Sequence, residues 1–311
     1  MAAGNGSLAV IAAAVLWGTT GTVATFAPGV GPLAVGAAAM GIGGLLQALA
    51  AARIIRAHRV ALLGNWRLIG LSAVATAVYP LAFYTSMRLA GVAVGTVVTI
   101  GSAPAISALI ERIADKRRLS RRWVLGAGLG VAGIVLLTVA RSAHAGTSAT
   151  HPLAGIALGV AAAATYALYS WGAGRMMGTI PSRAVMGTVF GIGGVLLLPV
   201  LVATGAPIVA SAQNLTAVAY LAIVPMFLGY VLFGRGLATL PVSTVTTLTL
   251  LESAVAAFCA VVVVGEQLAP SGWGGVGLIF VSLVLTAHAA AQSVATKAGE
   301  PPRTEVPSTI V

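Results

Sequence analysis

The chain contains ten successive apolar stretches, each long enough to cross a lipid bilayer as an α-helix. A hydrocarbon core of about 30 Å needs about 20 helical residues, because each residue adds about 1.5 Å. The stretches are continuously apolar and lack the alternation of a lipid-facing β-barrel. The sequence therefore predicts an all-α polytopic membrane protein with transmembrane helices over 7–26, 33–52, 68–88, 91–111, 123–140, 153–174, 184–204, 215–235, 241–264 and 271–290.

The composition excludes a soluble fold and argues against a nucleic-acid partner. Of the 311 residues, 59% are hydrophobic and 7% are charged, whereas about a quarter are charged in soluble domains. The net charge is +11, but the Lys and Arg residues lie between the apolar stretches instead of gathering on one folded face. The single cysteine, Cys259, excludes a disulfide framework. We therefore expect a lipid bilayer around the protein and no nucleic acid as a partner.

The positions of the basic residues predict the orientation in the membrane. If the N-terminus is cytoplasmic, the cytoplasmic segments hold all 17 Lys and Arg residues except Arg88 and Arg141. Positive residues are retained on the cytoplasmic side of a membrane. We therefore predict a multi-pass protein of the cell (inner) membrane with its N- and C-termini in the cytoplasm.

The chain repeats itself at an interval of 150 residues: Gly41-Ile42-Gly43-Gly44 returns as Gly191-Ile192-Gly193-Gly194, and Trp123 returns as Trp273. Five helices fill this interval, and an odd number makes the second copy cross the membrane in the opposite direction. The sequence therefore predicts two inverted five-helix repeats that share a central substrate site. The expected boundaries are 1–140 for the first repeat, 141–152 for a connector, 153–291 for the second repeat and 292–311 for a disordered cytoplasmic tail.

Among the six acidic residues, Glu252 stands apart because it falls near the middle of an expected membrane helix. A carboxylate at that depth is costly unless it is paired or hydrated. No Lys or Arg falls at a comparable depth in any of the expected helices. We expect Glu252 to exchange protons or to bind a cationic group. The alternative is a protonated side chain that only joins its neighbours in packing.

Hydroxyl residues accompany Glu252 at intervals of three along its helix, and others take the matching positions of the first repeat. This spacing places them on one helix face. Aromatic residues also fall inside the expected helices, where buried Tyr hydroxyls need partners. A simpler role for the threonines is hydrogen bonding to backbone carbonyls. The candidates for lining a substrate cavity are Trp17, Tyr79, Tyr84, Thr96, Thr99, Ser102, Tyr166, Tyr169, Tyr230, Thr246, Thr249 and Ser253.

Three prolines fall inside expected helices: Pro80, Pro104 and Pro225. Each removes a backbone donor and frees a carbonyl that must find water, a hydroxyl or a ligand. We therefore predict helix kinks beside a cavity, with simple packing bends as the alternative.

The sequence lacks motifs for catalysis: it has no His-Glu-x-x-His, no Gly-x-Ser-x-Gly and no glycine-rich loop that ends in a lysine. His144 and His151 in the connector have no Cys or carboxylate neighbours with which to form a metal site. We therefore expect no enzyme activity, no metal and no cofactor.

Six short motifs point to a known family. They are Leu16-Trp17-Gly18-Thr19, Arg88-Leu89-Ala90-Gly91-Val92-Ala93, Pro104, Leu251-Glu252, Gly265-Glu266-Gln267-Leu268 and Gly274-Gly275-Val276-Gly277. Over about residues 7 to 290, this pattern resembles the ten-helix EamA branch of the drug/metabolite transporter superfamily. The resemblance implies a secondary carrier, commonly an exporter of amino acids, related metabolites or toxic compounds, that works by alternating access. The related small multidrug exporters use a membrane-embedded glutamate for proton antiport, a role that only Glu252 could take here.

The chain departs from this family pattern in two places. Asp115-Lys116-Arg117-Arg118-Leu119 replaces the usual Gly-Glu-x-Leu turn, which indicates that this turn serves membrane topology. Ser253 stands where a proline is common. This substitution predicts a straighter ninth helix that packs Glu252 more closely.

Together, these features predict a secondary active transporter that exports a small organic solute in exchange for protons. The solute is an amino acid, a related metabolite or a drug-like compound. The expected partners are this small-molecule substrate, protons and the lipid bilayer, and the expected assembly is a monomer or homodimer. Two alternatives stay open: an uncoupled facilitator of small metabolites, and a membrane enzyme that acts on lipid-linked substrates.

Overall fold

The computed structural model describes residues 2–117, 119–142, 151–265 and 268–298. Ten of its helical spans are long and apolar enough to cross a membrane, and each overlaps one of the ten expected stretches. The prediction of an all-α polytopic membrane protein is therefore confirmed. The spans are Gly4–Ala24, Pro32–Ala57, Trp66–Ala90, Val94–Ala114, Arg121–Ala140, Pro152–Met176, Ser182–Thr204, Ala212–Leu237, Val242–Val263 and Pro270–His288.

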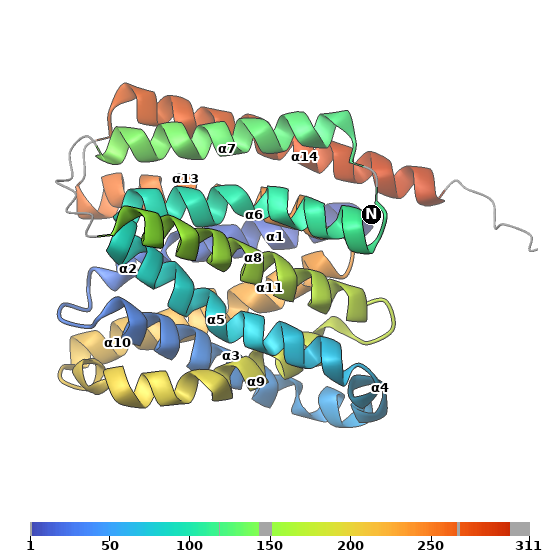
Figure 1. Cartoon of the computed structure of the whole chain (residues 1–311), viewed down its shortest axis with the longest axis horizontal. Helices are drawn as coiled ribbons and strands as arrows, with labels where there is room; N and C mark the ends of the chain where they lie inside the picture. Colours follow the sequence, from blue (N-terminus) through green and yellow to red (C-terminus); the bar gives the residue numbers. More distant parts are fainter. Residues whose placement is uncertain (1, 118, 143–150, 266–267, 299–311) are drawn as a thin grey trace, which may run out of the picture.

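Several spans are built from more than one helical segment, so the secondary-structure elements outnumber the membrane crossings (Figure 1). In chain order the elements are α1 (Ala2–Gly18), α2 (Thr20–Ala24), α3 (Pro32–Ala57), α4 (Arg59–Gly64), α5 (Trp66–Ala90), α6 (Val92–Ala114), α7 (Arg121–Ser142), α8 (Pro152–Met176), α9 (Ser182–Thr204), the 3₁₀ helix η1 (Ala206–Ile208), α10 (Ala212–Leu221), the π-helix η2 (Ala222–Gly229), α11 (Tyr230–Leu237), α12 (Val242–Leu248), α13 (Leu251–Cys259), the π-helix η3 (Ala260–Val264) and α14 (Pro270–Ala298).

Two inverted five-helix repeats make up the bundle, as the sequence predicts. The repeated glycine motifs meet where α3 packs along α9. A Cβ on Gly194 would lie 2.6 Å from the Gly41 carbonyl oxygen, and a Cβ on Gly44 would overlap the backbone of Phe190. Small residues let helix backbones approach closely in lipid. The same motif in both repeats therefore brings the two halves into contact.

The last helices of the two repeats, α7 and α14, form a second close pair along one edge of the bundle (Figure 1). Their backbones touch through glycines: a Cβ on Gly275 would lie 2.6 Å from the Gly133 carbonyl oxygen. The α3–α9 pair lies along the opposite edge (Figure 1). The other helices of the bundle therefore lie between two glycine-mediated contacts that join the repeats.

The ends of the repeats differ slightly from the expected boundaries. α7 runs to Ser142, and α14 runs to Ala298, past the expected start of the tail at residue 292. The added residues 292–298 contain no Gly or Pro that would end the helix. Most of the connector, including His144, and the tail from residue 299 lie outside the described residues.

An even number of spans places the beginning of α1 and the end of α14 at the same end of the bundle (Figure 1). We call this end the terminal face and the other end the opposite face. α6, α8 and α11 reach the terminal face at their C-terminal ends, and α9 and α12 start there. These helix ends form the contacts that close one side of the cavity.

Candidate functional site

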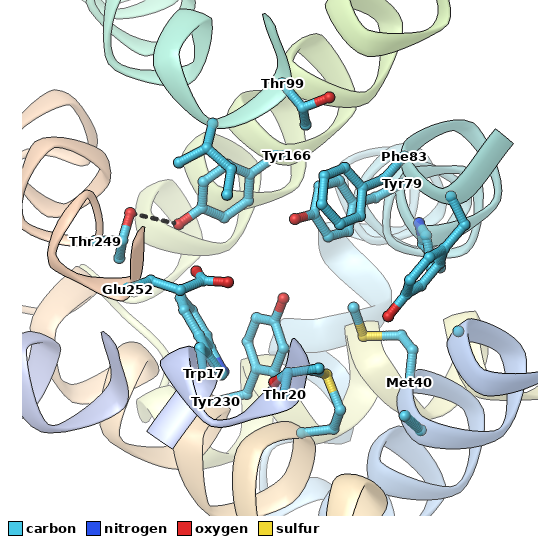
Figure 2. A pocket seen from close by; sticks show the side chains of 16 residues that line it. Trp17, Thr20, Met40, Tyr79, Phe83, Thr99, Tyr166, Tyr230, Thr249 and Glu252 are labelled. Atoms are coloured by element: carbon cyan, nitrogen blue, oxygen red, sulfur yellow. Dashed lines mark hydrogen bonds between the residues drawn. The ribbon is translucent and has the colours of Figure 1, made fainter. Parts of the chain in front are cut away.

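A cavity lies inside the bundle, where helices of both repeats meet (Figure 2). Its volume is about 60 Å³, which leaves room for a few water molecules. Pockets that hold drug-sized ligands measure about 300–1,000 Å³, so in this conformation the cavity is too small for a ligand of that size. Its walls combine aromatic rings, hydroxyl groups and one carboxyl group from Trp17, Thr20, Gly36, Ala39, Met40, Tyr79, Pro80, Phe83, Tyr84, Thr99, Ile100, Tyr166, Met226, Tyr230, Thr249 and Glu252.

The Glu252 carboxyl group points into this cavity from the first turn of α13 (Figure 2). The side chain keeps part of its surface exposed. Within the described part of the chain, the carboxyl group makes no hydrogen bond and no ion pair. Both of its oxygens are therefore available to a proton or to a solute.

A break in the ninth membrane helix brings Glu252 to the cavity. A turn at Thr249 and Leu250 separates α12 from α13. The Thr246 and Thr249 hydroxyls donate to backbone carbonyls three or four residues earlier, and such bonds bend helices. The prediction of a straighter helix with a closely packed Glu252 is therefore wrong.

Trp17 forms one wall of the cavity, and the eighth membrane helix holds it in place. Its indole N–H donates to the Pro225 carbonyl at 2.9 Å, and Pro225 lies in the π-helix η2. Gly229 makes room for the ring, because a Cβ there would lie 2.7 Å from the indole nitrogen. The rings of Trp17 and Tyr230 have centroids 4.7 Å apart. The aromatic wall therefore depends on the widened turn of η2.

Tyrosine hydroxyls fix the remaining rings. The Tyr166 hydroxyl lies 3.2 Å from Thr249 Oγ1, and the Tyr230 hydroxyl lies 2.9 Å from that of Tyr169. Tyr79 packs on Tyr166 with ring centroids 5.5 Å apart. Each pair joins two helices, so the rings around Glu252 are held by hydrogen bonds and by stacking.

Several predicted lining residues are not at the cavity: Thr96, Ser102, Tyr169, Thr246 and Ser253. Three of them lie about one helical turn closer to the terminal face than a residue of the same membrane helix that does line the cavity: Ser102 relative to Thr99, Tyr169 relative to Tyr166, and Thr246 relative to Thr249. At that level, packed side chains fill the interior of the bundle. Thr96 instead donates to a methionine sulfur at 3.6 Å. The Ser253 hydroxyl is buried without a partner among the described residues. Helical spacing identified the right helices but not how far the cavity extends along them.

The three prolines have different surroundings. Pro80 lines the cavity from a continuous α5. Pro225 lies within η2 and accepts the Trp17 indole. Pro104 faces a groove between α6 and α7, away from Glu252. A proline beside the cavity is therefore found in the third and eighth membrane helices.

Seven residues line the cavity that were not predicted from the sequence: Thr20, Gly36, Ala39, Met40, Phe83, Ile100 and Met226. Most of them are apolar, and nothing in the sequence separates them from other lipid-facing or packing residues. Thr20 was detectable, since it lies one turn beyond Trp17 in the same span. The hydroxyls of Thr20 and Thr99 have no partner among the described residues, so both remain free to bind a solute.

The interior between the cavity and the terminal face is closed. Fully buried side chains fill it, among them Val10, Phe233, Val245 and Leu248. The cavity itself is lined by residues from the middle of the helices and from their halves nearer the opposite face. A solute in the cavity is therefore blocked from the terminal face by packed side chains.

Glu111 joins the two repeats at the terminal face. This residue, near the end of α6, is 3% exposed, and its carboxylate accepts hydrogen bonds from the backbone N–H groups of Val242 at 2.8 Å and Ser243 at 3.3 Å. The Ser243 hydroxyl also donates to it. A carboxylate at this position satisfies free N–H groups and the dipole at the start of α12. Arg117 lies 4.0 Å away.

Asp115 adds a second contact between the repeats. Its carboxylate accepts the Trp171 indole N–H at 2.8 Å and pairs with the Arg175 guanidinium, both from α8. The partners lie 56 and 60 positions away in sequence. The turn after α6, expected to serve topology, therefore also ties the repeats together, which sequence alone did not predict.

The connector histidines do not form a cluster in the described residues. His151 lies at the N-cap of α8 on the opposite face, whereas His144 is outside the described range. The described residues contain no group of three or more His, Cys, Asp or Glu side chains that could hold a metal ion.

Known proteins share this sequence and this fold. The EamA-like transporter family matches residues 4–139 and 153–287, one match for each repeat. The "Uncharacterized transporter YwfM" of Bacillus subtilis (strain 168) is 35% identical over 286 residues, which cover 91% of this chain and 94% of that protein. A solved structure titled "Crystal structure of protein" has the same fold, with a TM-score of 0.77 and 20% identity over 93% of this chain and 98% of that one. The protein is thus a multi-pass membrane transporter for a small molecule, and the chain belongs to the EamA-like transporter family.

Proposed function

We propose that the protein is a secondary active transporter that exports a small organic solute with a cationic amino group, in exchange for protons. An amino acid, a related amine or a drug-like cation fits this description. One observation carries the proposal: in the cavity, Glu252 is unpaired among the described residues and is surrounded by aromatic rings. A carboxylate and aromatic faces together favour a cation.

The walls of the cavity support a cationic solute over an anionic one. The residues around it include one carboxyl group and no Lys or Arg. Cation–π contacts contribute about 0.5–2 kcal/mol each, and the Thr20 and Thr99 hydroxyls offer further polar contacts. An anion here would meet Glu252 without any compensating positive charge.

Competition at one carboxyl group is the simplest basis for exchange. A proton and an ammonium group cannot both neutralise Glu252, so binding one releases the other. The closed terminal half supports alternating access, since a solute exported from the cytoplasm must enter through a face that is packed in this conformation. The basic residues of the terminal face, among them Arg53, Arg183 and Arg235, support a cytoplasmic location for that face in the inner membrane.

Transport into proteoliposomes tests this proposal. A panel of amino acids, organic cations and nucleosides is offered with and without an imposed pH gradient. We expect uphill movement of cationic solutes driven by the gradient, and solute-dependent proton movement reported by a pH-sensitive dye inside the vesicles. Glu252→Gln should abolish both, while Glu252→Asp should retain part of the activity.

Ser253→Ala is the matched control, because this neighbour lies outside the cavity and should transport like wild type. If Glu252→Gln moves solute uphill as wild type does, coupling through Glu252 is refuted. Wild-type transport that is downhill only would instead establish the uncoupled facilitator. Chemical conversion of a lipid-linked substrate that is lost in His151→Ala would establish the enzyme.

A further inference from the structure

A second cavity, separate from the one around Glu252, opens between α1, α3, α9 and α11. Its volume is about 420 Å³, several times that of the central cavity. It extends from the terminal face, where α9 begins and α11 ends, to the middle of the bundle. We call it the lateral groove. Its walls are Leu16, Gln47, Ala50, Ala51, Ser182, Arg183, Met186, Phe227, Leu228, Val231, Leu232, Gly234 and Arg235.

The groove is apolar along its length and opens on the outer surface of the bundle. Leu228 is 44% exposed, and Ala50 is also exposed. In a membrane these positions face lipid tails. A ligand in this groove therefore needs a long apolar part, which a free sugar, nucleotide or amino acid lacks.

The mouth of the groove is positively charged. Arg183 is the second residue of α9, and Arg235 lies in the last turn of α11. Both side chains are exposed, and neither is ion-paired with an acidic side chain in the described ranges. The start of α9 adds free N–H groups and the positive end of a helix dipole. These groups together favour a phosphate at the terminal face.

Gln47 is a buried polar residue in the inner wall of the groove. The side chain is 3% exposed and lines the groove. Its amide N–H₂ donates to the Met226 carbonyl at 3.3 Å, whereas its amide oxygen has no partner among the described residues. A buried acceptor without a partner costs about 1–3 kcal/mol.

Gln47 lies deeper in the groove than the arginines. A Cβ on Gly187 would be 3.0 Å from the Gln47 backbone carbonyl oxygen, and Gly187 is about one helical turn deeper in α9 than Arg183. The Gln47 amide bonds to Met226, nine positions before Arg235 in the eighth membrane helix, so it lies in the inner, apolar part of the groove.

We propose that the lateral groove binds an anionic phospholipid. Its phosphate lies between Arg183 and Arg235, and an acyl chain follows the apolar wall past Gln47 toward Phe227. Basic pockets between transmembrane helices bind anionic lipids in this way. The site does not depend on the transported solute, since it shares no lining residue with the central cavity.

Lipid binding by the purified full-length protein in detergent tests the proposal, with native mass spectrometry to count bound lipids. Dioleoyl phosphatidylglycerol is the probe. Dioleoyl phosphatidylcholine has the same chains without net charge, and glycerol phosphate has the head group without chains. We expect phosphatidylglycerol to bind at least tenfold more tightly than either. Equal binding of phosphatidylcholine, or equal binding of glycerol phosphate, would overturn the site as proposed.

Matched variants distinguish the groove from general surface charge. Arg183→Gln with Arg235→Gln should weaken phosphatidylglycerol binding at least tenfold. Arg53→Gln with Arg59→Gln removes the same charge from exposed residues near the terminal face that do not line the groove, and it should change binding less than threefold. Equal losses in both pairs would show attraction to the whole face and refute the site.

One further variant keeps the charge and tests the groove itself. Ala50→Phe fills it from an exposed position, where folding is not at risk, and should weaken phosphatidylglycerol binding at least tenfold. Unaltered binding in Ala50→Phe would place the lipid elsewhere.

Discussion

Replacing Glu111 by alanine should open the terminal face. The carboxylate accepts two backbone N–H groups and one hydroxyl from the start of α12. A hydrogen bond to a charged group contributes about 1.5–3 kcal/mol, and loss of an N-cap costs about 0.5–2 kcal/mol. Both ranges describe the same contact between Glu111 and α12, so they are not added. We therefore expect Glu111→Ala to destabilise the closed terminal face by about 2–3 kcal/mol. This energy corresponds to about a 30- to 140-fold larger open population.

A buried cysteine reports this opening. Val245 is fully buried between the cavity and the terminal face, so Val245→Cys in a Cys259→Ser background should react slowly with a water-soluble thiol reagent. When closing is faster than labelling, the labelling rate follows the open population. Glu111→Ala should therefore raise the labelling rate by about 30- to 140-fold.

Arg117→Gln is the control. Its guanidinium lies 4.0 Å from Glu111, and its side chain is 35% exposed. Such a pair contributes about 0–1 kcal/mol, so labelling should rise less than about sixfold. If Glu111→Ala labels at the wild-type rate, or if both variants label alike, the Glu111 contact does not hold this face closed.

Three further substitutions test the packing of the site. Gly229→Ala should displace the Trp17 indole and weaken binding of a cationic solute by about 2- to 30-fold, the range for one lost cation–π contact, measured by equilibrium binding. Tyr169→Phe leaves the Tyr230 hydroxyl without its partner at 2.9 Å and should lower the free energy of unfolding in detergent by about 1–2 kcal/mol. Gly44→Ala pushes a methyl group against the backbone of α9 and should cost about 1–3 kcal/mol, with less monodisperse protein on size exclusion.

Each substitution has a control elsewhere in the fold. Gly70→Ala and Gly64→Ala add a methyl group where no atom outside the local helix backbone lies within 4 Å, so neither solute binding nor folding should be impaired. Tyr79→Phe removes a hydroxyl with no hydrogen bond among the described residues, so stability should hold. If a control substitution changes the measured binding or stability as much as its test substitution does, the contact inferred for the test residue is contradicted.

The two prominent carboxylates show the limits of sequence reasoning. Glu252 was identified because an ionisable side chain in the middle of an apolar stretch is energetically costly inside a membrane. The position of such a residue can be recognised from the sequence without coordinates. Glu111 is the last residue of the expected helix 91–111, and no function was predicted for it. Its partners are more than 130 positions away, and nothing local marks them.

The cavity wall shows a similar division. Trp17 and Tyr166 were expected to line it, because the N–H or hydroxyl group of an aromatic side chain inside a membrane helix needs a hydrogen-bond partner. Met40 and Ile100 were missed, because an apolar residue in a membrane helix can face lipid, a neighbouring helix or a cavity without a change in the local pattern. Thr246 was included wrongly, since helical spacing does not show where a cavity ends.

The sequence by itself determined that this protein crosses a membrane ten times as two inverted repeats. Apolar length and a fixed repeat interval are one-dimensional properties, and the bilayer permits few ways to satisfy the backbone. Only the tertiary structure decided that the ninth helix breaks before Glu252, that one end of the bundle is closed, and that a charged groove lies beside α9. These features arise from contacts between distant segments, whose energies depend on distances that the order of residues does not contain.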